Sequence, residues 1–78
     1  MHYDPQAAGR VIRRMRRQKH MTQDLLSGFA GIARSHLSMI ENGTKQANMD
    51  TLWRIAQALE IAPSRLVAAI EEEITQPN

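Results

Sequence analysis

The sequence predicts an all-α fold: five short helices packed as one compact domain over residues 1–78. Apolar residues recur three and four positions apart in five successive segments, which is the spacing of one helix face. Residues that cap helices, or a proline suited to the first turn, precede four of these segments, and glycine follows two of them. The expected pattern contains no strand, no internal repeat and no linker long enough to separate two domains.

The composition favours a small soluble protein. The chain has no cysteine, so neither a disulfide framework nor a thiolate metal site can stabilise it. No apolar run approaches the roughly 20 residues that span a bilayer, and the first residues lack the apolar stretch of a signal peptide. We therefore expect a cytoplasmic protein that does not enter a membrane. So short a chain buries only about 60% of the surface exposed on unfolding, and a partner subunit would stabilise it.

The charge is unevenly distributed along the chain. Residues 1–20 contain six Lys and Arg against one Asp, a net charge of +5, whereas residues 60–78 contain four Glu against one Arg, a net charge of −3. A basic cluster suggests an anionic partner such as nucleic acid. A solvated helix face is the alternative interpretation.

The first helix is expected over about residues 5 to 19. Asp4 can cap it, and Pro5 suits its first position. One face is apolar and the other faces carry arginines, so the helix offers its charge to water or phosphate. The apolar face consists of Ala8, Val11, Ile12 and Met15.

Residues 22–43 predict two helices joined by a turn. Thr22 can cap the first of them, and Gly31 can end it in the left-handed conformation. The second begins at Ala33 or Arg34, and Asn42-Gly43 closes it. Its strongly apolar residues are only Leu37 and Ile40, a narrow stripe that leaves the rest of the helix outside the core. The residues expected outside are Arg34, Ser35, His36, Ser38 and Met39.

Two further helices complete the pattern. Asn48 can cap the fourth helix, which buries a stripe ending at Leu59. The fifth helix is expected over residues 63–74 and carries apolar residues at near-heptad spacing. The two stripes consist of Leu52, Ile55, Ala56 and Leu59, and of Leu66, Val67, Ile70 and Ile74.

These residues resemble the helix-turn-helix domains of phage repressor and Cro-type regulators, the lambda-repressor-like or XRE family. The resemblance covers about residues 8–66 without a gap in spacing. The matching residues are Arg16, Thr22-Gln23, Leu26, Ala30-Gly31-Ile32, Arg34-Ser35, Leu37-Ser38, Ile40-Glu41-Asn42-Gly43, Thr51-Leu52, Ile55-Ala56, Ala58-Leu59 and Leu66.

The resemblance implies a sequence-specific regulator of transcription that binds double-stranded DNA, with repression from a palindromic operator as the default. The third helix would enter the major groove. The residues expected to face bases are Ala33, Arg34, Ser35, His36 and Met39. Those expected to anchor phosphates are Thr22, Gln23, Ser38, Asn42 and Lys45. For His36 and Met39 a solvated role stays equally open. Arg16 and Glu41 match a pair that joins the first helix to the end of the third.

The sequence departs from the family pattern at several positions. His20 stands where the family usually has glycine, and Ala33 and Ala62 replace capping serine or threonine. Leu25 and Phe29 form an apolar step where the family usually has polar residues. We expect the N-terminal segment, including Tyr3, to cover this step; a protein partner at Leu25 and Phe29 is the alternative.

The fifth helix supplies a candidate dimer interface at Val67, Ile70 and Ile74, with core packing as the other interpretation. A homodimer would present two recognition helices to a palindrome.

An enzyme is not expected, because the three histidines, His2, His20 and His36, have neither zinc-site spacing nor a nucleophile partner. Neither metal nor cofactor is predicted. The serious alternative to a DNA-binding regulator is a protein-interaction module, such as an antitoxin or adaptor, that may also regulate its own promoter.

Overall fold

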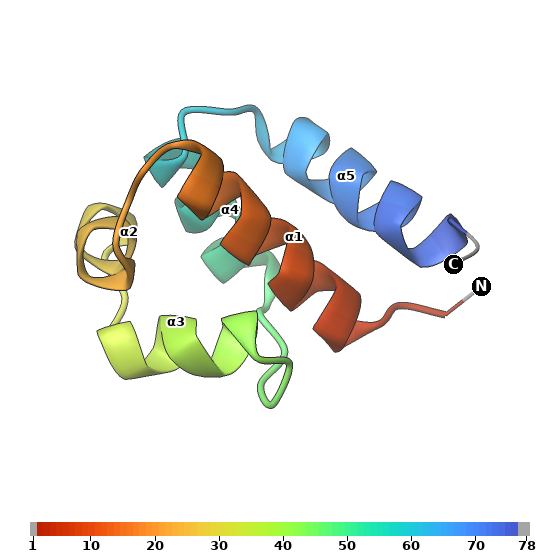
Figure 1. Ribbon diagram of the computed structural model, residues 1–78, viewed down its shortest axis with the longest axis horizontal. Coiled ribbons are helices and arrows are strands. Elements are labelled where there is room, and N and C mark those ends of the chain that lie inside the picture. The colour runs from red at the N-terminus through yellow and green to blue at the C-terminus, as the bar shows by residue number, and fades with distance from the viewer. Residues whose placement is uncertain (1, 77–78) are drawn as a thin grey trace.

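The computed structural model describes residues 2–76, and it has the predicted all-α class (Figure 1). None of these residues belongs to a strand. In Figure 1, α1 crosses the middle of the view, with α3 below it and α5 above it, and it packs against both. α2 packs against α3 and α4, and α4 packs against α5. The helices are α1 (Pro5–Gln18), α2 (Gln23–Ala30), α3 (Arg34–Glu41), α4 (Met49–Ala58) and α5 (Pro63–Thr75).

Three side chains cap the helices as expected. The Asp4 carboxylate accepts from the Gln6 amide at 3.0 Å, the Thr22 hydroxyl from the Leu25 amide at 3.1 Å, and the Asn48 side chain from the Thr51 amide at 2.8 Å. α3 and α5 follow Ala33 and Ala62, which make no such bond. Each of these two helices therefore forgoes about 1 kcal/mol of capping stabilisation. α1 ends at Gln18, one residue earlier than expected.

Among residues 2–76, four have a left-handed backbone. Gly31 and Gly43 were expected to end helices, and their φ values are 71° and 83°. His20 has a φ of 57°, as anticipated for the position where the family has glycine. Glu60, which follows α4, has a φ of 61°, and no feature of the sequence had indicated this.

One hydrophobic core lies between the helices and takes residues from all five. Leu37 and Ile40 fasten α3 to it, and Leu66 and Ile70 fasten α5. Ile70 is only 3% exposed, so it belongs to the core of the single chain and has little surface left for a dimer interface. The largest fully buried side chains are Val11, Ile12, Leu26, Leu37, Ile40, Ile55, Leu59 and Leu66.

Candidate nucleic-acid interface

α2, the turn and α3 form a rigid unit. Gly31 directs the chain out of α2, and the amide of Ile32 donates back to the carbonyl of Ser27 at 3.0 Å. Ile32 itself packs half-buried against the core. The angle between α2 and α3 is thus set by a backbone hydrogen bond and by an apolar anchor in the turn.

α3 buries one narrow face and exposes the other. Leu37 and Ile40 are at most 1% exposed, as their spacing predicted. The predicted base-reading residues Ala33, Arg34, Ser35 and Met39 are exposed, whereas His36 is half-buried. The exposed side chains at the start of α3, with Met39 one turn further on, leave this surface open to a ligand such as a major groove, which admits one α-helix.

Arg34, at the start of α3, is only loosely held. Its Nε lies 3.1 Å from Oδ1 of Asp24 in α2, and the two side chains are 58% and 80% exposed. Exposed ion pairs contribute about 0–1 kcal/mol. The Arg34 guanidinium can therefore leave Asp24 for a guanine edge, which two parallel hydrogen bonds would recognise.

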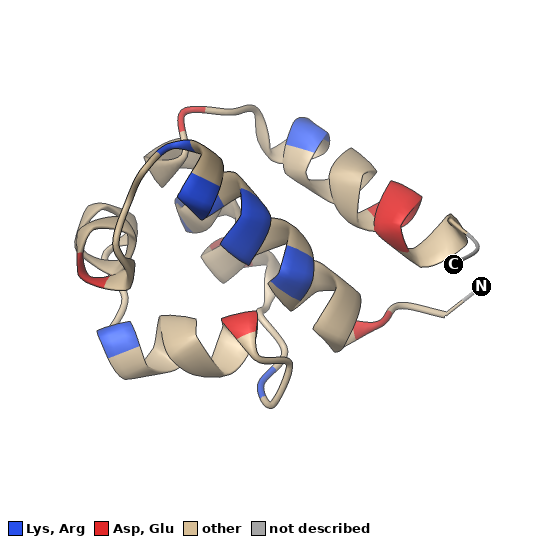
Figure 2. Ribbon diagram, viewed as in Figure 1, with Lys and Arg blue, Asp and Glu red and all other residues tan. Residues whose placement is uncertain are grey.

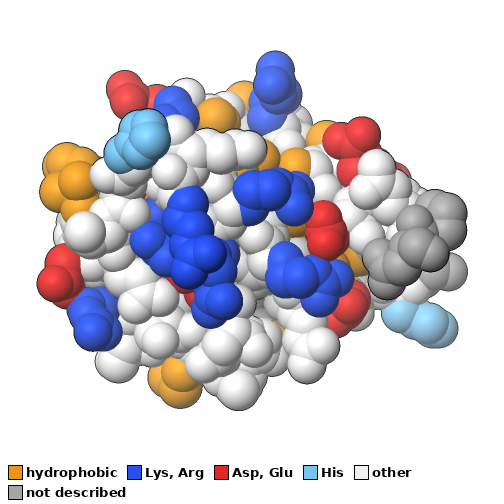
Figure 3. All heavy atoms as spheres, viewed as in Figure 1, with side chains coloured by type: hydrophobic (Ala, Val, Ile, Leu, Met, Phe, Trp, Pro, Cys, Tyr) orange, Lys and Arg blue, Asp and Glu red, His pale blue; other side chains and the backbone are white. Residues whose placement is uncertain are grey.

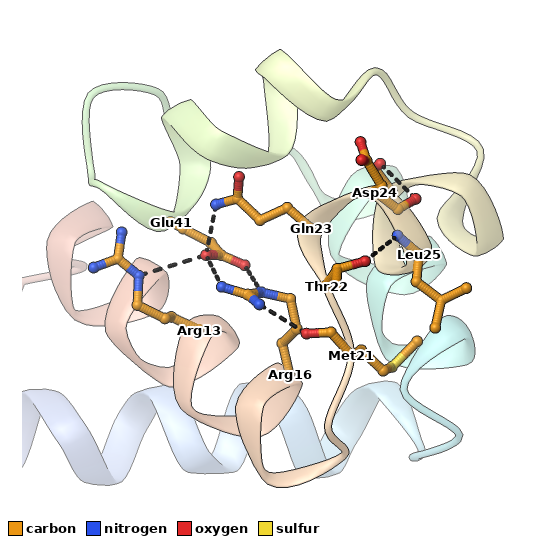
Figure 4. Close-up of polar contacts among 9 residues, drawn as sticks. Arg13, Arg16, Met21, Thr22, Gln23, Asp24, Leu25 and Glu41 are labelled. Carbon is orange, nitrogen blue, oxygen red and sulfur yellow. Dashed lines mark hydrogen bonds and ion pairs between the residues drawn. The ribbon is translucent and has the colours of Figure 1, made fainter.

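The carboxylate of Glu41 joins three helices (Figure 4). Arg16 of α1 donates to it twice, from Nε to Oε2 at 2.7 Å and from Nη2 to Oε1 at 3.0 Å. Gln23 of α2 donates to Oε1 at 3.0 Å, and Arg13 of α1 approaches the same oxygen at 3.4 Å. The remaining Arg16 nitrogen donates to the carbonyl of Met21 at 2.8 Å. The predicted pairing of Arg16 with Glu41 is thus present, and it fixes the C-terminal end of α3.

Arg16 is 8% exposed and Glu41 only 2%, so two charged groups are buried here and each needs its partner to offset the cost of desolvation. Burial alone would raise the pKa of Glu41, but the hydrogen bonds from Arg16 and Gln23, with the positive charge of Arg16, lower it below its ordinary value. The hydrogen bond to Glu41 raises the pKa of Arg16. Both groups are therefore charged at neutral pH, and each depends on the other.

Of the predicted phosphate anchors, Thr22 and Gln23 lie at the start of α2, Ser38 within α3, and Asn42 and Lys45 after it. Gln23 donates one amide hydrogen to Glu41, and its second amide hydrogen remains available to a ligand. Asn42 accepts from the amide and the hydroxyl of Thr44 at 3.0 and 2.7 Å, so both hydrogens of its amide group remain available. The other anchors differ in exposure: Thr22 and Lys45 are exposed, and Ser38 is half-buried.

Arg13 is the member of this cluster that sequence reasoning missed. It stands one turn before Arg16 on α1, and Arg13 therefore reaches the same carboxylate. That spacing was the available signal. Among five arginines in one helix, however, the sequence does not distinguish those that face α3.

A second surface lies on the opposite side of the core, between α4 and α5. Val67 is 43% exposed and Met49 is 61% exposed. Together with Tyr3 and the half-buried Ile74 they line an apolar hollow, and Ile70 forms part of its floor. Two of the three predicted dimer residues, Val67 and Ile74, therefore reach a surface.

The expectation that Tyr3 covers Leu25 and Phe29 is wrong. Tyr3 lines the hollow beside α5, together with Met49 and Val67. Leu25 and Phe29 are 46% and 67% exposed and line a separate hollow with Trp53 of α4. The physical reason is that the N-terminal segment precedes α1 at the end of the molecule near α5, away from α2 (Figure 1).

Residues 2–76 offer neither a metal-binding cluster nor a membrane-spanning helix. No group of three or more His, Asp or Glu side chains is placed to hold a metal ion. No helix there has the length and apolar character needed to cross a membrane.

Comparison with known proteins identifies relatives that match most of the chain. A family model described as Helix-turn-helix matches residues 12–66. The uncharacterized HTH-type transcriptional regulator y4dJ from Sinorhizobium fredii is 33% identical over 64 residues, which is 82% of this chain and 83% of that protein. Control protein C.BamHI from Bacillus amyloliquefaciens is 32% identical over 60 residues, covering 76% of this chain and 74% of its own.

Solved structures share the same fold. The restriction-modification controller protein C.Esp1396I, solved as a tetramer in complex with its natural 35 base-pair operator, has a TM-score of 0.86 to this chain. The two are 24% identical, and the match covers 97% of this chain and 100% of that one. This likeness extends through all five helices.

Proposed function

Because the chain belongs to the helix-turn-helix family, we propose that it is a transcriptional regulator that binds double-stranded DNA and reads its sequence with α3. The observation that carries this proposal is the combination of a fixed helix and a free face. Glu41 fastens one end of α3 to α1 and α2, while Arg34, Ser35 and Met39 at the other side stay exposed. A recognition helix requires both properties, since its register must be fixed while its side chains reach base edges.

In this proposal the contacts divide into two kinds. Arg34 and Ser35 read base edges, and each good bidentate contact discriminates by about 1–3 kcal/mol. Ala33 and Met39 offer apolar contact to a thymine methyl group. Gln23 and Asn42 hold the backbone through the amide hydrogens that their own contacts leave free.

The regulator acts as a homodimer on a palindromic operator. Recognition helices of such dimers lie one turn of DNA apart, about 34–36 Å. The apolar hollow at Val67, Met49 and Tyr3 supports a self-complementary contact beside α5. C.Esp1396I binds its natural operator as a tetramer, so assembly on DNA has a precedent in this fold. We propose that it acts as a repressor that blocks polymerase at this operator.

The test is a titration with two duplexes at several salt concentrations. One duplex is the sequence directly upstream of the protein's own coding sequence, and the other is a random sequence of equal length. Specific binding should favour the upstream duplex by at least about a thousandfold and should weaken steeply as salt rises. Equal affinity for both duplexes would refute autoregulation at that site, and the same comparison is then made with genomic fragments selected by the protein.

A protein-interaction module is the second candidate, as in an antitoxin or adaptor. The exposed Leu25, Phe29 and Trp53 favour it, because they line one hollow and large exposed apolar patches mark interaction sites. The two roles are compatible on separate faces. A Phe29→Glu variant that remains as stable and binds DNA as well as the parent removes any role for this patch in stability or DNA binding.

A further inference from the structure

α1 carries a ridge of four arginines on one face. Arg10, Arg13, Arg14 and Arg17 follow the spacing of a helix stripe, and with Gln18 they line a shallow hollow. Figure 2 shows the basic residues along the α1 ribbon, and Figure 3 shows Lys and Arg side chains gathered over α1 in the middle of this face. A dense row of positive charge on one helix attracts anions to that surface.

One carboxylate of α5 pairs with half of the ridge. Arg10 donates from Nε to Oε2 of Glu73 at 3.0 Å, and Arg14 donates from Nη1 to Oε1 of the same carboxylate at 3.1 Å. Glu73 thus uses one oxygen for each arginine. These two arginines already have a role, which is to fasten α5 to α1.

The other two arginines of the ridge, Arg13 and Arg17, are less well paired. Arg13 reaches Glu41 at 3.4 Å, a long contact to an oxygen that Arg16 and Gln23 also use. No ion pair involves Arg17 anywhere within residues 2–76. Arg13 and Arg16 share the single carboxylate of Glu41, and Arg17 adds a third positive charge, so these three arginines and one glutamate carry an excess of two positive charges.

This excess charge adjoins the DNA-binding unit. The nitrogens of Arg13 and Gln23 contact the same oxygen of Glu41, so they lie within two hydrogen-bond lengths of each other. Gln23 is the predicted phosphate anchor at the start of α2. Arg17 follows Arg13 by one helical turn, about 6 Å further along α1 toward the connection to α2.

We propose that Arg13 and Arg17 bind phosphates of the DNA backbone, so that the DNA interface continues from α2 and α3 onto α1. The inference rests on the proposed DNA-binding function and adds α1 to the surface that contacts DNA. Phosphates are the appropriate ligand because guanidinium groups bind them through paired hydrogen bonds and because a backbone presents regularly spaced charge to a ridge. These contacts add affinity without adding sequence preference.

The experiment compares Arg17→Gln with Arg14→Gln, which remove the same charge from the same helix one turn or less apart. Binding to the upstream duplex and to a random duplex is measured between about 50 and 200 mM salt. Arg17→Gln should lower the slope of log K against log salt by about 1, the value expected for one lost phosphate contact. The substitution should weaken binding to both duplexes by the same factor. Arg14→Gln should change the slope much less.

Three results overturn the inference. The first is a salt slope of Arg17→Gln equal to that of the parent. The second is an equal fall in the slope for both variants. The third is a loss of affinity in Arg17→Gln for the upstream duplex alone. In each case the parent still prefers the upstream duplex, so DNA reading by α3 stands and only the role of α1 fails. A parent that binds both duplexes equally instead refutes the proposed function at that site. Arg13→Gln is scored only with its thermal midpoint, because Arg13 also contacts Glu41; Arg17 decides the outcome if that variant is unstable.

Discussion

Gly9 of α1 lies against the backbone of Glu41 at the end of α3. A methyl group built on Gly9 would lie 2.5 Å from the carbonyl oxygen of Glu41 and would also overlap the carbonyl of Ile40. The two helices therefore cross at a distance that only glycine permits. Glu41 is fastened to α1 twice, by its backbone at Gly9 and by its carboxylate at Arg16.

Gly9→Ala should destabilise the protein. Alanine favours a helix by about 0.5–1 kcal/mol over glycine, but forcing α1 away from α3 should cost about 1–3 kcal/mol. The loss is read from urea unfolding. Gly28→Ala is the matched control, since a methyl group there meets no atom within 4 Å. It should stabilise the protein by about 0.5–1 kcal/mol. Changes of the same sign in both variants would contradict the crossing described.

Glu41→Gln should lower stability by about 3–5 kcal/mol, because it leaves the buried charge of Arg16 without its partner. DNA binding should weaken through this loss of stability, which the thermal midpoint measures. Glu73→Gln is the control, because it removes a carboxylate that also receives two arginines but lies at the surface. Its effect on stability should be much smaller, because water screens an ion pair at the surface. A Glu41→Gln protein with the parent's thermal midpoint would sink the explanation.

The stability difference between parent and Glu41→Gln should depend on pH. The pKa of Glu41 is lowered in the folded protein, so its stabilisation is complete above the unfolded pKa of about 4.3 and is lost as the pH falls through the lower folded pKa. Urea unfolding of both proteins at a series of acidic pH values tests this. The gap should be constant near neutrality and should narrow below about pH 4.3. A gap that widens with acid would contradict the assigned direction. Glu73 is present in both proteins, so its own pH dependence cancels in the difference between their stabilities.

His20→Gly should stabilise the protein. A left-handed backbone is unfavourable by about 1–2 kcal/mol for a residue with a Cβ, and glycine's greater freedom in the unfolded chain offsets about 0.5–1 kcal/mol of that. We expect a net gain of up to about 1 kcal/mol, or a rise in Tm of about 4–8 °C. Glu60→Gly should act in the same direction, since its φ is 61°, and Gly31→Ala should act in the opposite one. A lower Tm for His20→Gly would mean that its side chain contributes contacts that outweigh the strain.

Local features of the fold were predictable because they depend on neighbours in sequence. Asp4, Thr22 and Asn48 cap helices by reaching amides two or three residues ahead, and a sequence displays that spacing directly. The exposed face of α3 was predictable for the same reason, since only Leu37 and Ile40 are apolar enough to bury. The Arg16 and Glu41 pair, 25 residues apart, came from the family resemblance and not from spacing.

The features that were missed depend on which helices meet in space. The close crossing at Gly9 involves a helix 30 or so residues further along, and the left-handed backbone of Glu60 has no glycine or asparagine to announce it. Ile70 matched a surface pattern as well as a core pattern, and only the packing of α5 on α1 and α4 buries it. Tyr3 was assigned to the wrong hollow because the sequence does not show on which side of α1 the N-terminal segment lies.

The dimer surface can be separated from the apolar step on α2 by two matched substitutions. Val67 and Phe29 are both exposed apolar residues on helices, and Val67 alone lines the hollow beside α5. If two copies meet through α5, Val67→Glu buries two like charges near the symmetry axis and should shift sedimentation from dimer to monomer. It should also weaken binding to a palindromic duplex far more than binding to a single half-site, because the half-site needs one recognition helix only. Phe29→Glu should leave the sedimentation profile unchanged. If Phe29→Glu disrupts the dimer and Val67→Glu does not, the copies meet through α2 and α4 instead.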